Sequence, residues 1–387
     1  MIDCYTSTLK LMRLLEAGHS PDELLGAAGS EHDSAHVLMR MSMLFHIFGK
    51  FAEALELQAE ALRLRRQYQL RADRAPTTLH LLVIVTSGYM LENTPVEFLI
   101  EDSDIACTLL YVIPDAPLPS ALPAHDVVFL AIGQFEQHRP LFARVLPLLR
   151  KAAGPVLNLP GPAFGFERDR VNALLQGIPG LVVPPTRNLS RHELERMAAG
   201  EAAGAAFPLI VRPLRSQAGV GLARLLCAED IGSYLEVQAE PAFYLAPYVD
   251  YRSADGMYRK CRLLLLRGRP LVCHYAISSH WVVHYQSAGM ADSASKRDEE
   301  ANFIADAEQG FCRRHGAALA QVAARIGLDY VVLDCGETPD GRLLFFEADN
   351  VSVVHAVDPA VVFPYKQAHM ATVFQAFHDL LRGRARA

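Results

Sequence analysis

Near its carboxyl end the chain carries two short apolar segments separated by a strong turn signal. The segments are Tyr330–Cys335 and Leu343–Asp349, and Pro339-Asp340-Gly341 lies between them. Apolar runs of this length on either side of a Pro/Gly turn predict an antiparallel β-hairpin. The alternation of side chains along a strand then determines which residues of the hairpin share a face.

Three carboxylates lie on this hairpin. Glu347 and Asp349 are two residues apart and point to one face, and Asp334 near the end of the partner strand can reach the same place. Three like charges would repel strongly without a cation between them. Hard oxygen ligands suit Mg2+, which usually shares its coordination shell with substrate phosphates. The residues by themselves leave two interpretations open, a magnesium site or a solvated hairpin edge.

Composition argues against other classes of protein. The chain has 387 residues, enough for two or three domains, with 51% hydrophobic residues and a formal net charge of −6. No basic tract favours a nucleic-acid partner, and no apolar run is long enough to span a membrane. The amino-terminal residues do not resemble a signal peptide, and the seven cysteines show no paired spacing. We therefore expect a reduced, cytoplasmic protein, with a homodimer as the default oligomer.

Residues 1–75 predict helices. Apolar residues recur at helical spacing between Ala35 and Tyr68 with one break at Gly49, which predicts a helical hairpin similar to a tetratricopeptide repeat. Residues 7–28 could form a degenerate partner pair. One such unit cannot bury its own face, so the helices dock on the rest of the chain, on a second copy or on a peptide. Docking on the rest of the chain is the simplest of the three.

From residue 76 to residue 184, apolar strands alternate with helices. Strands that are apolar on both faces predict a parallel α/β sheet. No G-x-G-x-x-G motif follows them, so a dinucleotide site is not indicated. The expected strands are Leu79–Val85, Ala106–Ile113, Val127–Ala131 and Pro155–Leu159.

From residue 185 onward the chain predicts strands joined by short loops. The glycine-rich stretch Ser216–Gly221 lies between two strands and could bring backbone N–H groups to a phosphate, although a plain hairpin turn is the alternative. In the strand Arg259–Leu266, Lys260 and Arg262 share one face and Arg259 points to the other. The polar residues 286–300 predict a mobile loop or lid. Two helices are expected after it, at Glu299–Ile326 and His369–Arg382.

The order of these segments resembles the ATP-grasp superfamily, of which glutathione synthetase and D-alanine–D-alanine ligase are members. The resemblance is carried by F-P-L-I-V-R-P with its glycine-rich turn, F-Y-L-A-P-Y-V-D, Y-R-K-C-R-L-L-L-L-R-G-R-P and the E-A-D-N hairpin. It implies an ATP-grasp domain at 185–387 with a hinge near 244–250, a preceding α/β domain at 76–184 and the helical segment 1–75. The expected fold class is α/β, becoming α+β in the carboxyl-terminal half.

The resemblance also implies roles for individual residues toward ATP and Mg2+. Arg212 stands where the family usually has a phosphate-contacting lysine, which is not a neutral exchange. The family ending E-x-N is E-A-D-N here, so the third metal ligand is Asp349 or Asn350, and the strand period favours Asp349. The implied nucleotide-binding residues are Arg212, Ser216, Gln217, Gly219, Gly221, Tyr244, Ala246, Tyr248 and Val249. The implied catalytic residues are Arg259, Lys260 and Arg262, and the implied metal ligands are Asp334, Glu347, Asp349 and Asn350.

A second dense group of side chains could line an acceptor pocket, although packing is an alternative for each of them. It comprises His274, His280, Trp281, His284 and His355. The function implied by the resemblance is an ADP-forming carboxylate–amine ligase that works through an acyl phosphate, with an amino acid, peptide or related small acid as substrate. Two alternatives stay open. One is a peptide-binding scaffold with an inactive ATP-grasp fold, and the other is a peptide-modifying ligase of a natural-product pathway that uses residues 1–75 to recruit its peptide.

Overall fold

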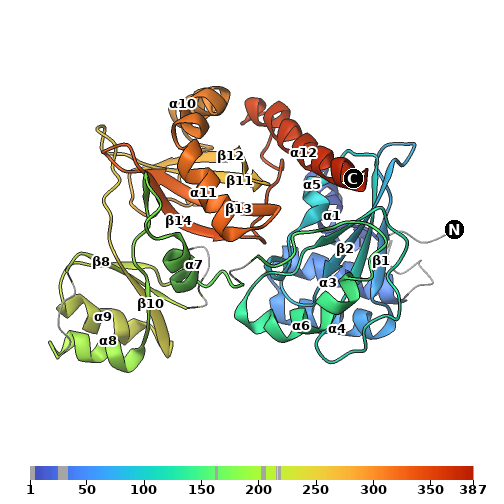
Figure 1. Cartoon of the computed structure of the whole chain (residues 1–387), viewed down its shortest axis with the longest axis horizontal. Coiled ribbons are helices and arrows are strands. Elements are labelled where there is room, and N and C mark those ends of the chain that lie inside the picture. Colours follow the sequence, from blue (N-terminus) through green and yellow to red (C-terminus); the bar gives the residue numbers. More distant parts are fainter. Residues whose placement is uncertain are drawn as a thin grey trace.

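The computed structural model describes residues 5–24, 34–161, 164–201, 206–214, 216 and 219–386. Within these residues the chain forms three β-sheets covered by helices (Figure 1). The N-terminal sheet has the strand order β1-β3-β2-β4-β5, the small sheet β7-β10-β8-β9, and the C-terminal sheet β12-β11-β13-β14-β6. None of the described helices has the length and hydropathy needed to cross a membrane.

The N-terminal sheet is parallel except at one edge, as expected from strands that are apolar on both faces. β2, β3, β4 and β5 pair in parallel, whereas β1 pairs with β3 in the antiparallel direction. β1 lies within the segment expected to be helical, because a strand of four residues is too short to show a period of two. The strands are β1 (Gln67–Leu70), β2 (Leu79–Val85), β3 (Ile105–Tyr111), β4 (Val127–Leu130) and β5 (Val156–Leu157).

The amino-terminal helices dock on the N-terminal sheet. α3 (Ser34–Ile47) and α4 (Phe51–Leu64) pack against each other, as the sequence predicts, and α1 (Thr8–Glu16) lies beside α3. Met39 and Ala61 belong to the same buried cluster as residues of β2, so these helices bury their apolar faces within the chain. The similarity to a tetratricopeptide repeat stays a prediction, and residues 25–28 of the expected partner pair lie outside the described residues.

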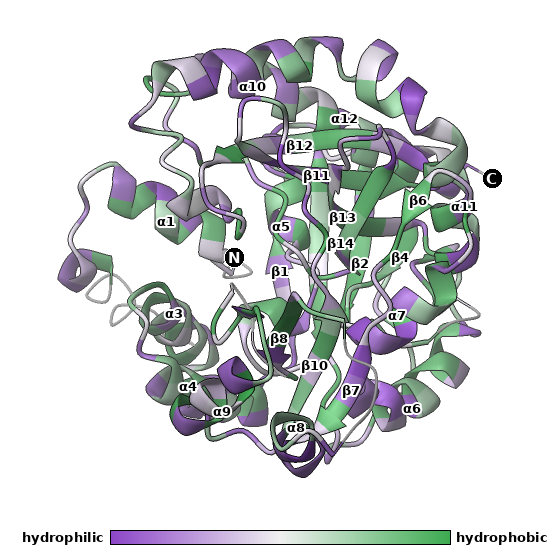
Figure 2. Ribbon diagram, turned by 90° about the vertical axis from the view of Figure 1, so that its left-hand side faces the viewer, coloured by the Kyte–Doolittle hydropathy of each residue, from purple (hydrophilic) through white to green (hydrophobic). Residues whose placement is uncertain are grey.

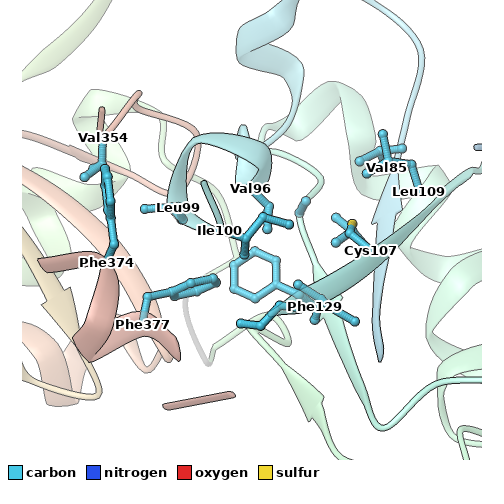
Figure 3. Close-up of a cluster of buried hydrophobic side chains, with 14 of the residues drawn as sticks. Val85, Val96, Leu99, Ile100, Cys107, Leu109, Phe129, Val354, Phe374 and Phe377 are labelled. Atoms are coloured by element: carbon cyan, nitrogen blue, oxygen red, sulfur yellow. The ribbon is translucent and has the colours of Figure 1, made fainter. Parts of the chain in front are cut away.

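Two further helices cover the N-terminal sheet. α6 (Arg139–Leu149) packs on one face through Leu141, Phe142 and Val145, and the short α5 (Val96–Leu99) packs on the other. Figure 3 shows where α5 meets β4 and the carboxyl-terminal helix α12 (Pro364–Ala385) around Phe129 and Phe377. The rings of these two residues are 5.7 Å apart. The C-terminal sheet reaches the same core, because the ring of Tyr330 lies 5.9 Å from that of Phe129.

The small sheet forms a lobe with its own helices, α8 (Arg191–Ala198) and α9 (Glu229–Val237), seen at the lower left of Figure 1. Its strands are antiparallel, and Val211, Ile231 and Phe243 are completely buried between the sheet and the helices. The glycine-rich stretch connects β8 to β9, as the sequence predicts. The strands are β7 (Arg187–Ser190), β8 (Leu209–Pro213), β9 (Ala223–Leu225) and β10 (Ala242–Pro247).

The C-terminal sheet contains the predicted hairpin. β13 and β14 are antiparallel, with Asp334 opposite Glu347 and Val332 opposite Asp349. Hydrophobic residues dominate β13, which Figure 2 shows beside the strands of the N-terminal sheet. The strands are β11 (Tyr258–Leu266), β12 (Arg269–Ser278), β13 (Tyr330–Glu337), β14 (Leu343–Asp349) and β6 (Leu181–Val182).

Three expectations about the helices of this region differ from the structure. The expected loop 286–300 is helical from Ala294, because Ser293 caps the amino end of α10 (Ala294–Asp306). The expected long helix is divided, with a π-helical turn at Glu308–Cys312 between α10 and α11 (Gly316–Ile326). α12 begins five residues before the expected start because Pro364 is accommodated in its first turn.

A short segment before the small sheet packs with the C-terminal sheet. α7 (Arg168–Leu175) contributes Val171 and Leu175 to the core of that sheet, and β6 pairs in parallel with β14. These residues precede the domain boundary expected at 184. The consequence is that the start of α7 is placed beside the carboxylates of the hairpin.

Candidate functional site

Four polar side chains form a row across the C-terminal sheet. Arg262 on β11 is opposite Asp334 on β13, Asp334 is opposite Glu347 on β14, and His274 on β12 is opposite Arg262. Residues that lie directly opposite each other in antiparallel strands project from the same face, so the four side chains are neighbours. Lys260, two residues before Arg262, projects from this face as well.

Asp334 is the buried centre of the row. Its side chain is 2% exposed and accepts hydrogen bonds from Lys260 Nζ at 2.8 Å and from Arg262 Nε at 2.7 Å. Burial by itself favours the protonated acid, but the charges of Arg262 and Lys260 outweigh it and hold the pKa of Asp334 well below its usual range. Asp334 is therefore ionised, and it fixes two cations over the sheet.

Glu347 is paired with a cation from outside the sheet. Arg168, the first residue of α7, forms an ion pair with it. Burial opposes ionisation of Glu347, and the charge of Arg168, with smaller contributions from Lys260 and Arg212, lowers its pKa. Sequence reasoning missed Arg168, because the only local signal was its position at the start of a predicted helix.

The small sheet contributes Arg212 to the same place. On β8, Arg212 Nε donates to Ser216 Oγ at 3.1 Å, and a second guanidinium nitrogen donates to the Ser216 carbonyl. Burial and the nearby charge of Arg168 lower the pKa of Arg212 to about 10, which still leaves it charged at neutral pH. Glu347 raises the pKa of Arg212 and Arg212 lowers the pKa of Glu347, so cations from both lobes act electrostatically on one carboxylate.

Asn350 does not fit its expected role as a metal ligand. It is fully buried, and its side-chain oxygen accepts from the backbone N–H of Gln134 at 3.1 Å while its amide nitrogen donates to the Ile132 carbonyl at 3.0 Å. The side chain thus ties the end of β14 to the loop after β4. The sequence could not indicate this, because both partners lie more than two hundred residues away.

Asp349 is partly engaged by its own turn. It accepts from the backbone N–H groups of Val351 and Ser352 at 2.9 and 2.6 Å and from the Ser352 hydroxyl at 2.9 Å. Burial and the charge of Glu347 raise its pKa. Among the described residues no group of three His, Cys, Asp or Glu side chains has the arrangement of a metal site.

The pair Asp334 and Glu347 still fits a magnesium ion that arrives with a nucleotide. Mg2+ is commonly held by one or two carboxylates together with phosphate oxygens, and these two acids lie opposite each other on one face. In the structure Lys260, Arg262 and Arg168 neutralise them. The donor set is therefore suited to a shared metal–phosphate site and not to an ion bound by protein alone.

Arg259 lies away from the row, which corrects its expected catalytic role. It is on β11 but on the opposite face from Lys260 and Arg262. It pairs with Asp255 at 2.7 Å and with Glu299 of α10 at 2.5 Å. These ion pairs connect the start of β11 to α10.

The expected hinge and glycine loop lie close to the loop that follows β12. Tyr248 makes an edge-to-face contact with Trp281, with ring centroids 5.7 Å apart, and the Arg224 guanidinium lies 4.9 Å from the Tyr248 ring. A Cβ on Gly219 would lie 3.6 Å from Val282, so the glycine loop approaches the same segment. Tyr244 pairs with Arg212 across β10 and β8, Ala246 and Val249 border the hinge, and Gln217 lies outside the described residues.

The expected acceptor-pocket histidines are in different surroundings. Burial, followed by the charges of Lys260 and Arg262, lowers the pKa of His284. His280 is exposed, and its Nδ1 accepts from the Val282 N–H at 3.2 Å. His355 lies near Asp358, and burial lowers its pKa despite that carboxylate.

A buried lysine lies behind these residues. Lys366 Nζ is 3.2 Å from Glu300 and 2.9 Å from Asp358, and it also donates to the Tyr285 hydroxyl. Glu300 in turn accepts from the Tyr365 hydroxyl at 2.6 Å. This cluster connects α10, α12 and the loop after β12.

No protein-family model and no curated protein matches this chain. Similar solved structures include the VanG D-Ala:D-Ser ligase from Enterococcus faecalis, with 13% identity over 80% of this chain and 99% of that chain, at a TM-score of 0.48. D-alanyl-alanine synthetase A from Vibrio cholerae has 12% identity, the same coverage of both chains and a TM-score of 0.48. The D-alanine–D-alanine ligase from Coxiella burnetii has 11% identity over 80% of this chain and 96% of that chain, at a TM-score of 0.47.

The observed fold class is the expected one, α/β with mainly antiparallel sheets in the carboxyl-terminal half. Structural similarity at sequence identities of 11–13% says nothing about the reaction that this protein catalyses. The chemistry has to be inferred from the residues of the site.

Proposed function

We propose that this protein is an ADP-forming, ATP-dependent carboxylate–amine ligase that acts through an acyl phosphate. The observation that carries the proposal is the convergence of four cations from three segments on two opposed carboxylates. Arg212 comes from the small sheet, Arg168 from α7, and Lys260 and Arg262 from β11, while Asp334 and Glu347 belong to the hairpin.

The cations are arranged to bind two anions that must react with each other. Phosphoryl transfer to a carboxylate requires ATP and an acid to be held close together despite their mutual repulsion. Arg212 and Arg168 lie where the two lobes meet and would bind phosphate oxygens of the nucleotide. Lys260 and Arg262 lie deeper in the row and would hold the reacting carboxylate.

Asp334 and Glu347 would hold Mg2+ together with the phosphates, and the ion would supply charge neutralisation of the transferring phosphoryl group. When phosphate is present, Arg168 can exchange Glu347 for a phosphate oxygen. Lys260 and Arg262 together donate several hydrogen bonds to Asp334. They can keep some of these hydrogen bonds while other N–H groups turn toward the substrate. These ion pairs would therefore keep the cations oriented for the reaction.

The reaction would proceed in two steps. The substrate carboxylate attacks the terminal phosphorus of ATP, giving an acyl phosphate and ADP. An amine then attacks the acyl carbon, and inorganic phosphate leaves. The loop after β12, which the glycine loop approaches at Val282, would exclude water from the acyl phosphate.

The test is release of ADP and phosphate from ATP and Mg2+ in the presence of pooled carboxylic acids and pooled amines, with mass spectrometry of the products. We expect turnover that depends on both pools, and a loss of about 10²–10³-fold in Asp334→Asn and Glu347→Gln. Asp340→Asn is the matched control, because Asp340 is an exposed acid in the turn of the same hairpin and should leave turnover unchanged.

A protein that binds no nucleotide would contradict the proposal and favour the peptide-binding scaffold. ATP with Mg2+ at 100 times its dissociation constant should stabilise the folded protein by about 2.7 kcal/mol. The absence of a thermal shift at millimolar ATP would remove the basis for a ligase. If the protein is a peptide-modifying ligase, the same screen should give products from pooled peptides and not from amino acids.

A further inference from the structure

His274, one of the side chains expected to line an acceptor pocket, is the member of the row that has no part in binding the nucleotide, the metal or the reacting carboxylate. It lies directly opposite Arg262, next to the groups that would hold the reacting carboxylate. Its Nδ1 is shielded from solvent and has no hydrogen-bond partner among the described residues. A buried polar atom without a partner calls for an explanation, and a ligand that donates a hydrogen bond would supply one.

Tyr285 and Lys366 fix the position of the His274 imidazole. The ring of Tyr285 lies 4.6 Å from that of His274, and the Tyr285 hydroxyl accepts a hydrogen bond from Lys366. Lys366 is itself fixed between Glu300 and Asp358. The ring therefore keeps one orientation toward the row, which a group that transfers a proton requires.

The groups around His274 keep it neutral. Burial lowers its pKa well below the usual value, and the charge of Arg262 lowers it further, followed by those of Lys260 on the same strand and Lys366 on α12. Asp334 on β13 acts in the opposite direction but does not outweigh them. At neutral pH the ring thus carries a free lone pair in a site that is otherwise rich in cations.

We propose that His274 is the proton acceptor for the attacking amine, an inference that rests on the proposed ligase function. The amine nitrogen forms a bond to the acyl carbon, and the proton of the resulting ammonium passes to His274. The carbon–oxygen bond to phosphate then breaks, with its electron pair leaving on phosphate. His274 returns the proton to phosphate or solvent, so that the imidazole is neutral for the next turnover.

Hydroxylamine separates this step from the formation of the acyl phosphate. It is largely unprotonated at neutral pH and traps acyl phosphates as hydroxamates without help from a base. With pooled acids and ATP, we expect His274→Gln to form hydroxamate at nearly the wild-type rate. Amide formation from pooled amines should fall by about 10²–10⁴-fold, the range of general base catalysis.

Two further variants separate this role from a structural one. His274→Asn, which retains a polar atom near the position of Nδ1, should show the same split between amide and hydroxamate. His378→Gln removes a buried imidazole far from the row, at the contact of α12 with Leu99, and should change neither product by much.

A parallel fall of both products in the two His274 variants, or no fall in either, would overturn the role of His274. A wild-type protein that forms neither hydroxamate nor amide would instead overturn the ligase function, and the role of His274 with it.

Discussion

Asp334 and Glu347 lie directly opposite each other on β13 and β14, yet they are neutralised by cations from different parts of the chain. Lys260 and Arg262 from the neighbouring strand bind Asp334, whereas Arg168 from the start of α7 binds Glu347. A negatively charged ligand can compete for all three cations and release the two acids. Binding of nucleotide and binding of metal should therefore be strongly coupled.

Arg168→Met should reduce ADP release by about 10²–10³-fold, as expected for the loss of one charge-stabilising donor. Arg168→Lys should retain part of the activity because it keeps the charge. The control is Arg170→Gln, on the same helix but paired with Glu136 at the surface, which should behave like the wild type. If Arg168→Met and Arg170→Gln reduced kcat/KM equally, the role of Arg168 would be limited to the fold of α7.

Asn350→Ala should destabilise the protein without changing its requirement for magnesium. The variant leaves the Gln134 N–H and the Ile132 carbonyl without their partner, at a cost of about 1–3 kcal/mol for a buried unsatisfied group. Thermal denaturation and magnesium titrations of activity measure the two quantities. An increased magnesium requirement with unchanged stability would restore Asn350 as a metal ligand.

Lys366→Met should be strongly destabilising, by about 3–5 kcal/mol, because it leaves the buried carboxylate of Glu300 and the half-buried carboxylate of Asp358 without their cation. The side chains of Lys366 and Glu300 are 2% and 0% exposed, so water cannot replace the lost partner. The double variant Lys366→Met with Glu300→Gln should recover part of the loss. Thermal melting of the single and double variants measures this recovery. If the stability losses of the two single variants simply added in the double variant, Lys366 and Glu300 would not be coupled.

Trp281 should report binding of nucleotide. It is the only tryptophan of the chain, and it contacts Tyr248 and Arg224 at the hinge. A nucleotide held at the hinge excludes water, so emission should shift to shorter wavelength when ATP and Mg2+ are added. Arg224→Gln should change the emission of the free protein and weaken the response. Unchanged emission at saturating ATP would place the nucleotide elsewhere.

Stability should fall as pH is lowered below about 6.5, the unperturbed pKa of histidine. The folded-state pKa of His274 is lowered, so between the unfolded and folded values the unfolded chain binds a proton that the folded protein does not. Stability then rises with pH through this window and is lost as pH falls through it. Melting temperatures of the wild type and His274→Gln at pH 7.5 and 5.5 test this, and the variant should show the smaller decrease.

The sequence predicts the parts of this site that depend on local alternation. The turn at Pro339–Gly341 and the period of two place Glu347 beside Asp334, and the same period separates Lys260 and Arg262 from Arg259. The alternation puts Arg259 on the face opposite to Lys260 and Arg262, and there it pairs with Asp255 and Glu299.

The remaining differences arise from contacts between distant segments. Arg168 reaches Glu347 because α7 packs on the C-terminal sheet, and Asn350 turns away because the N-terminal sheet offers it two backbone partners. The sequence predicts a loop over the first half of α10, up to residue 300, because this stretch is polar on nearly all sides. Only Glu300 of this helix is buried, and its partner Lys366 lies on α12.

The core of the small sheet has a consequence for how substrates enter and leave. Among the described residues, the apolar cluster around Val211 and Phe243 shares no member with the clusters beneath the other two sheets. We therefore expect this lobe to move as a rigid unit when substrates enter and leave. Such a movement would break the ring contact of Tyr248 with Trp281, which a nucleotide bound beside these residues would replace.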